Sequence, residues 1–211
     1  MTQQAQTQRN PDPQGKVGVI LAAARELFLD AGYGNTSMDA VAKHAGVSKS
    51  TLYAHFENKE QLFGAVVGGV RQILHDSLKG ISTRDERDVA KMLRAIGTQF
   101  MSYVTAPHTL AIFRVVIGEL NKFPELGREM YNSGNLLITS LIADFFRQWT
   151  EAGLLAADDP VLAARQFLTL VKGDLQFRCL CQIDQEPSEA EIKRNVNAAV
   201  AMFLAHYGPK S

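Results

Sequence analysis

Apolar residues recur every three or four positions along nearly the whole chain, and no stretch alternates apolar and polar residues over the length of a strand. A spacing of three or four places apolar side chains on one face of an α-helix, whereas a half-buried strand has a period of two. We therefore predict an all-helical (all-α) protein of about nine helices. Their expected positions are 20–31, 36–45, 48–56, 58–80, 89–106, 110–120 and 124–153, followed by two helices that begin at residues 160 and 188.

Residues that begin helices support several of these boundaries. Ser188 with Glu191 three residues later has the pattern of a capping box, and Asp159 precedes Pro160 where another helix is expected to begin. The run Leu110–Leu120 is almost entirely apolar, which predicts a helix buried on all sides.

The most informative segment lies between residues 36 and 60. Thr36, with Asp39 three residues later, is expected to cap a helix that Gly46 ends in the left-handed conformation. Ser48 then begins a second helix almost at once. Two helices joined by so short a turn form a helix-turn-helix, in which one helix braces the other in the major groove of DNA.

The stretch Ile20–Phe63, about a fifth of the chain, also resembles the DNA-binding domain of the tetracycline-repressor (TetR) family. The resemblance is carried by Ala24, Phe28, Gly32-Tyr33, Thr36, Ala42, Ala45-Gly46-Val47-Ser48, Leu52-Tyr53, His55-Phe56 and Asn58-Lys59-Glu60. Further along, residues 122–126 are similar to the C-terminal domain of an efflux-regulator-like subgroup. Residues 153–155 with 159–160 are similar to the joint between the family's last long helices.

The second helix of the helix-turn-helix is the expected reader of DNA. Leu52 and Phe56 share one face, so Ser50 and Ala54 point away from it. We expect the flanking polar residues to bind phosphates and the short residues near the helix start to read bases. The structural alternative is a solvated face. The residues expected to bind DNA are Thr36, Ser48, Lys49, Ser50, Thr51, Tyr53, His55 and Lys59.

Net charge does not add to this prediction. The chain holds 22 basic and 22 acidic residues, and residues 1–62 hold six of each, whereas a DNA-binding domain is usually basic. Helix N-termini at Thr36, Ser48 and Asn58 can instead direct backbone N–H groups at phosphates. We expect modest non-specific affinity for DNA.

Composition points to a cytoplasmic protein with no membrane partner, cofactor or bound metal. The first fifteen residues are polar and rich in Gln, which predicts a mobile arm and not a signal peptide. No apolar run approaches the roughly eighteen residues of a membrane span. Cys179 and Cys181 are two residues apart on a predicted helix and point in different directions, so we expect buried thiols and not a disulfide.

The resemblance implies three segments: the arm at 1–15, a DNA-binding domain at 16–62, and a ligand-binding and dimerisation domain at 63–211. The candidate ligand contacts are Met101, Phe113, Arg114, Phe145 and Trp149. Core packing is the alternative for the apolar members of this set. Arg114 and Glu119 stand in an apolar run where an unpaired charge is costly, so each needs a protein or ligand partner. Asp174 and Arg178, four residues apart, most simply pair with each other.

As a whole, the resemblance implies a repressor that leaves a palindromic DNA operator when a small hydrophobic or aromatic molecule binds, and that forms a homodimer through its helices 8 and 9. One alternative is a DNA-binding regulator with no small-molecule ligand, its interior filled by side chains. Another is a helical enzyme or carrier on the same fold, but the sequence offers no catalytic residues in a nucleophile–base pair or metal set.

Three glycines, Gly64, Gly68 and Gly69, lie in the helix expected to join the two domains. Each costs up to about 1 kcal/mol relative to alanine in a helix interior. Two explanations are open for these glycines: a neighbouring helix that packs closely against them, or a flexible hinge.

Overall fold

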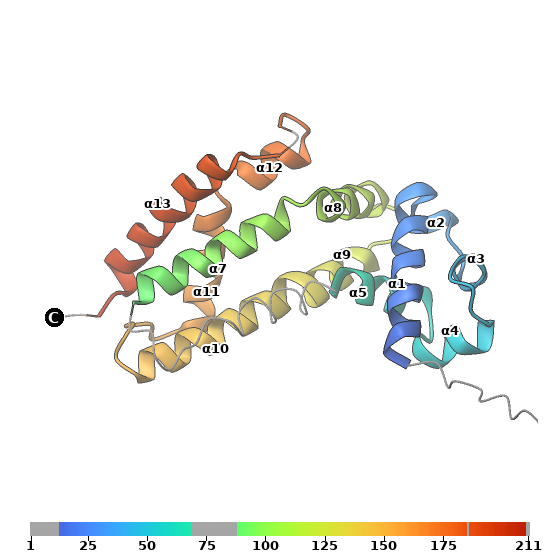
Figure 1. Cartoon of the computed structure of the whole chain (residues 1–211), viewed down its shortest axis with the longest axis horizontal. Helices are drawn as coiled ribbons and strands as arrows, with labels where there is room; N and C mark the ends of the chain where they lie inside the picture. Colours follow the sequence, from blue (N-terminus) through green and yellow to red (C-terminus); the bar gives the residue numbers. More distant parts are fainter. Residues whose placement is uncertain (1–12, 69–87, 185, 210–211) are drawn as a thin grey trace, which may run out of the picture. The chain divides into compact units, whose positions relative to one another are not determined.

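The computed structural model describes residues 13–68, 88–184 and 186–209, and these residues form helices and no strand (Figure 1). Within these described ranges nine helices have seven or more residues, which agrees with the predicted all-helical fold. The chain divides into two compact units, one ending at Val66 and the other beginning at Val67. We expected this boundary after residue 62; both positions lie within one helix, α5 (Lys59–Gly68).

Parts of three predictions fall outside the described residues. These are the first twelve residues of the expected N-terminal arm, the part of the expected 58–80 helix beyond Gly68, and Gly69. The last three residues of the expected arm belong to α1 (Pro13–Asp30).

The first unit contains α1, α2 (Gly32–Asn35), α3 (Met38–His44), α4 (Lys49–His55) and the beginning of α5. Its core is built around the rings of Phe28, Tyr33 and Phe63, whose centroids lie 5.4 to 5.5 Å apart. All three side chains are fully buried, as are Ile20 of α1 and Leu52 of α4. These contacts fix α4 against the rest of the unit, so its outer face has a defined composition.

The second unit contains α7 (Val89–Val104), α8 (Pro107–Glu119), α9 (Glu125–Met130), the π-helical segment η1 (Tyr131–Leu136), α10 (Leu137–Glu151), α11 (Pro160–Lys172), α12 (Leu175–Leu180) and α13 (Glu189–Tyr207). Within it α10 packs on α11, α11 on α13 and α13 on α7 (Figure 1). Phe146, Phe167 and Phe203 meet at the centre of this packing, with ring centroids 5.1 to 5.8 Å apart.

The structure corrects three expectations about these helices. The helix expected at 124–153 is interrupted by η1. The helix that begins at Pro160 was expected to include Asp174 and Arg178 but ends at Lys172, because Gly173 adopts a φ of +51°. Helix α8 is not buried on all sides, since Ile117 is 56% exposed. Among the described residues no single helix has the length and hydropathy of a membrane span; α7 and α8 reach that limit only as a pair bent by 59°.

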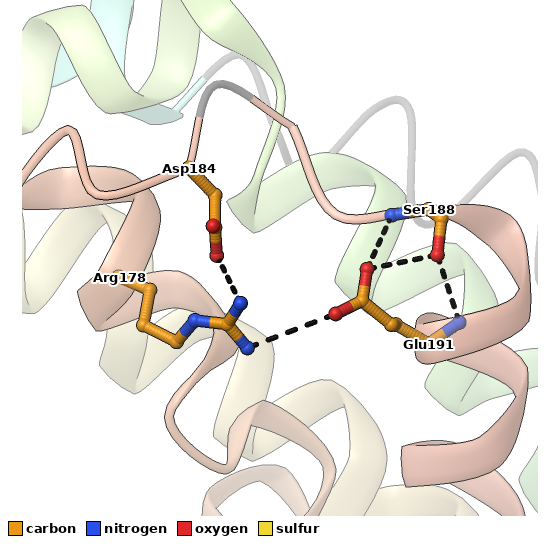
Figure 2. Close-up of polar contacts among 4 residues, drawn as sticks. All are labelled: Arg178, Asp184, Ser188 and Glu191. Atoms are coloured by element: carbon orange, nitrogen blue, oxygen red, sulfur yellow. Dashed lines mark hydrogen bonds and ion pairs between the residues drawn. The ribbon is translucent and has the colours of Figure 1, made fainter.

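Arg178 joins α12 to the start of α13. Its guanidinium lies 2.6 Å from the Asp184 carboxylate and 3.7 Å from that of Glu191, and Figure 2 shows it between the two. Glu191 also accepts hydrogen bonds from the backbone N–H and hydroxyl of Ser188, which lower the pKa of Glu191 and complete the predicted capping box. The predicted Asp174–Arg178 pair is wrong, because the loop after α12 brings nearer carboxylates to Arg178.

The two cysteines differ in environment. Both are free; Cys179 is buried, while Cys181, just after α12, is exposed. Burial raises the pKa of the Cys179 thiol. The expectation of two buried thiols therefore holds for Cys179 only.

Candidate functional site

The turn between α3 and α4 has the geometry that the sequence predicts. Gly46 has a φ of +65°, its N–H donates to the Lys43 carbonyl, and the N–H of Val47 donates to the carbonyl of Ala42 at 3.0 Å. These bonds make a Schellman motif, which ends α3 at a residue free of a Cβ. Ser48 then accepts a hydrogen bond from the N–H of Thr51 at 3.1 Å and caps α4. Residues 45–48 thus hold the two helices as a helix-turn-helix.

The outer face of α4 carries polar groups close to its N-terminus. Leu52 and Phe56 are buried, whereas Ser50 and Ala54 are exposed, which confirms the predicted inner and outer faces. The Ser48 hydroxyl lies 2.9 Å from that of Ser50 and 2.8 Å from that of Thr51. Further along, Tyr53 is 49% exposed and His55 is exposed. Short hydroxyl side chains at the start of a helix can form hydrogen bonds with base edges, and a longer polar side chain beside them can reach a phosphate.

The cap of α3 is not the residue that we predicted. Ser37 accepts a hydrogen bond from the N–H of Ala40 and is exposed. Thr36 is 3% exposed, and its hydroxyl donates to the carbonyls of Gly32 and Leu27 at 2.8 and 3.1 Å. The Thr36 side chain therefore holds the first unit together and is not available to DNA. The exposed helix N-termini of this unit stand at Ser37, Ser48 and Asn58, the last of which caps α5 by accepting from the Gln61 N–H.

The two lysines expected at phosphates both have protein partners. Lys49 Nζ lies 2.5 Å from an Asp39 carboxylate oxygen, and this hydrogen bond raises the pKa of Lys49. Both side chains are more than half exposed, so DNA phosphates can compete for this lysine. Lys59 is half-buried; its Nζ donates to the Tyr33 carbonyl at 2.8 Å and lies 4.2 Å from the centroid of the Tyr33 ring. Lys59 therefore has a structural role that the sequence did not indicate.

The second unit contains a cavity of about 240 Å³. Among the described residues, its apolar lining includes Val67, Phe100, Val104, Phe113, Met130 and Ile138. Its polar lining includes Tyr103, Asn135, Lys172 and Gln176. A mostly apolar cavity with a few polar groups is typical of a small-molecule site.

Of the predicted ligand contacts, only Phe113 lines this cavity. Met101 and Trp149 are buried in the core of the second unit, and the Phe145 ring packs on Trp149 with centroids 6.1 Å apart. All three residues thus pack in or against the core and lie outside the lining of this cavity.

Arg114 also has a different role. Its guanidinium donates to the carbonyl oxygens of Cys179 and Leu180 at 2.7 and 3.1 Å and so caps the C-terminus of α12. This contact satisfies the charge in the apolar run, and the ligand-contact prediction for Arg114 is wrong. Glu119 is half-buried at the last residue of α8.

The sequence missed the polar residues that do line the cavity. Tyr103, Lys172 and Gln176 lie on α7, α11 and α12, and nothing in their local patterns distinguishes them from ordinary helix-end residues. Lys172 in particular precedes Gly173, where a basic residue is expected to interact with the helix C-terminus.

Comparison with known proteins agrees with this geometry. Residues 20–66 match bacterial regulatory proteins of the tetR family, and residues 91–209 match the C-terminal domain of AefR-like transcriptional repressors. The solved structure of the flavonoid-responsive regulator FrrA is similar with a TM-score of 0.73 and 32% identity, over 94% of this chain and 100% of that chain. A TetR-family regulator from Mesorhizobium loti MAFF303099 gives a TM-score of 0.77 and 29% identity over the same shares.

Among curated relatives, the transcriptional regulator UidR of Escherichia coli strain K12 is 28% identical over 198 residues, which cover 88% of this chain and 91% of UidR. These relatives are transcriptional regulators and not enzymes. The chain belongs to the TetR family of DNA-binding transcriptional regulators.

Proposed function

We propose that this regulator is a cytoplasmic repressor that binds a palindromic operator as a homodimer and is released by a small hydrophobic or aromatic molecule. The observation that carries the proposal is the cavity of about 240 Å³, because its lining includes Val67. Val67 belongs to α5, the helix whose first residues form part of the DNA-binding unit. A ligand in this cavity would contact that helix directly.

The relatives support both parts of the proposal. The matched C-terminal domain is that of transcriptional repressors, and FrrA is a flavonoid-responsive regulator. For release to occur, the ligand must bind the conformation that cannot engage DNA more tightly than the one that can. A ligand with equal affinity for both would leave the operator occupied.

We assign the DNA contacts to the outer face of α4 and to the exposed helix starts of the first unit. Thr36 is buried and is not among the proposed contacts, whereas the neighbouring Ser37 is exposed and is included. The proposed contacts are Ser37, Ser48, Lys49, Ser50, Thr51, Tyr53, His55 and, beside its structural role, Lys59.

The homodimer is assigned to α11 and α13, which correspond to helices 8 and 9 of the sequence analysis. Ala198, Ala201, Met202 and Ala205 are exposed and share one face of α13, since they are three, four and seven residues apart. Small residues on one face let a second helix approach closely. Ala201→Glu is expected to convert a dimer to a monomer in light scattering, while Ala152→Glu, outside this face, is expected to leave the dimer intact.

The proposal is tested by footprinting the purified protein on the DNA around its own gene, with and without a library of hydrophobic aromatic compounds. We expect a footprint with two-fold symmetry that some of the compounds abolish. Phe113→Trp, which places a larger ring into the cavity, should keep the footprint and weaken the response. Phe177→Trp, at a 66% exposed position of α12, serves as the matched control. A footprint that survives every compound would favour a regulator without a small-molecule ligand.

A further inference from the structure

Among the described residues, Lys172 is the one cation that lines the cavity. It is the last residue of α11, is half-buried, and lines the cavity beside apolar residues such as Phe100, Val104 and Ile138. Among the described residues its ammonium has no ion pair and no hydrogen bond. Burial alone lowers the pKa of Lys172, as expected when a positive charge loses water without gaining a partner.

Three other half-buried cations among the described residues are paired. Arg114 donates to two carbonyl oxygens, Arg178 lies between two carboxylates, and Lys59 donates to the Tyr33 carbonyl. Each of these three cations therefore has hydrogen-bond acceptors or carboxylates within the protein. The Lys172 ammonium has no such acceptor among the described residues, and it lines a cavity large enough to admit a molecule.

The remaining lining limits what that molecule can be. The described residues place no carboxylate in the cavity, and its other polar side chains, which can all donate hydrogen bonds, are those of Tyr103, Tyr131, Asn135 and Gln176. An anionic oxygen would therefore meet donors and one positive charge. The rest of the wall is mostly apolar, and since a cavity of about 150 Å³ holds a benzene ring, about 240 Å³ suits a bicyclic aromatic body.

We infer that the ligand of this regulator is an aromatic acid, whose carboxylate or phenolate oxygen pairs with Lys172 Nζ while its rings fill the apolar part of the cavity. This inference rests on the proposed ligand response and names the class of the ligand. A neutral aromatic of the same shape fills the same space but leaves the ammonium without a partner.

The test compares two probes of nearly equal shape, naphthalene-2-carboxylate and naphthalene-2-carboxamide, by titration calorimetry on the full-length protein. Because a charge-assisted hydrogen bond is formed only with the carboxylate, we expect the wild type to prefer it by about tenfold or more. Lys172→Met keeps the length of the side chain and removes its charge, so it should abolish the preference. Lys122→Met, at an exposed position, should keep it.

A second pair, 2-naphthol and 2-methoxynaphthalene, separates the two kinds of acid. Titrated at neutral pH, where Lys172 keeps its charge, a preference for the naphthol that Lys172→Met abolishes identifies phenols as ligands as well. Lys172→Arg retains the charge and should retain a preference for the acids. The inference is overturned if the amide binds as tightly as the carboxylate, if Lys172→Met leaves the preference unchanged, or if no acidic probe binds.

Release of operator DNA, measured with the same compounds, distinguishes this inference from the proposed function. If the neutral and acidic probes release DNA equally well from both wild type and Lys172→Met, ligand-controlled repression stands and the aromatic-acid inference fails. If the acids bind through Lys172 but never release DNA, the binding site stands and the repressor mechanism fails.

Discussion

Tyr53 offers a single-atom test of the proposed DNA face. Its side chain is 49% exposed on α4, so its hydroxyl is free to reach a phosphate. Because hydrogen bonds to charged groups are the stronger ones, we expect Tyr53→Phe to lower operator affinity about tenfold, measured by fluorescence anisotropy. Thermal stability should not change. Ser140→Ala, which removes an exposed hydroxyl of the second unit, is the control; equal affinities for all three proteins would contradict the assignment.

Lys59 is expected to contribute to stability as well as to DNA binding. Lys59→Met removes the charged donor of the half-buried Tyr33 carbonyl, so we expect the free energy of unfolding of the first unit to fall by about 1 to 3 kcal/mol. Lys49→Met removes only an exposed ion pair and should leave the free energy of unfolding nearly unchanged. Chemical denaturation of both variants checks this. Undiminished stability of Lys59→Met would leave Lys59 a DNA contact alone.

For individual residues, the sequence predicts which side chains face the core better than it predicts which residues they contact. Spacing alone places Leu52 and Phe56 inside and Ser50 and Ala54 outside, because one helix period determines all four. Thr36 and Ser37 are adjacent and both suit a cap by residue type, so local signals do not distinguish them. The partner of Arg114 comes from α12, 65 residues further along the chain, and no local pattern encodes such a contact.

Among the helices, α12 depends on a contact from another element. Arg114 of α8 satisfies two of its terminal carbonyl oxygens, and a helix of six residues has little stability of its own. We expect Arg114→Leu to lower the free energy of unfolding by about 2 kcal/mol, because two partly buried acceptors lose a charged donor.

Thermal unfolding of Arg114→Leu beside Arg147→Leu checks this. Arg147 pairs with Asp144 at an exposed position, so its loss should have little effect. Similar melting temperatures for the two variants would show that α12 does not need its cap.

Helix ends that depend on adjacent residues are predictable, and those that depend on distant packing are not. Ser48, Asp159 and Ser188 each cap the helix that follows, as predicted, because the cap and its N–H partners lie within three residues. The end of α11 at Gly173 is different: an added Cβ there would lie 3.1 Å from the Asn195 side chain of α13, and only the folded unit brings these residues together. The π-helical turn at η1 likewise has no local signal.

In the joining helix, Gly68 does not require close packing. A Cβ added there would lie 3.6 Å from the Ser133 carbonyl oxygen, an ordinary contact. Close packing of a neighbouring helix therefore does not explain why this position is glycine. The other explanation, a hinge in α5, stays a prediction.

For the whole protein, electrostatics should set how strongly it holds any DNA. Asp39→Asn releases Lys49 from its ion pair, so we expect tighter binding to operator and unrelated DNA alike. The slope of log affinity against log salt should steepen by about one unit per subunit. The comparison is made in the Lys49→Met background, where Asp39→Asn should have no such effect. If Asp39→Asn still raises the affinity for DNA in the Lys49→Met background, the effect comes from the Asp39 carboxylate itself and not from the release of Lys49.

The pairing of Lys49 with Asp39 and of His44 with Glu26 has a consequence inside a living cell. A chromosome offers millions of wrong sites, and a strongly basic protein spends most of its time on them. With Lys49 already paired and only as many basic as acidic residues in residues 1–62, this protein would leave wrong sites quickly and keep a larger free pool. A small number of copies could then occupy one operator, and the gene would respond promptly when the signal molecule appears or is consumed.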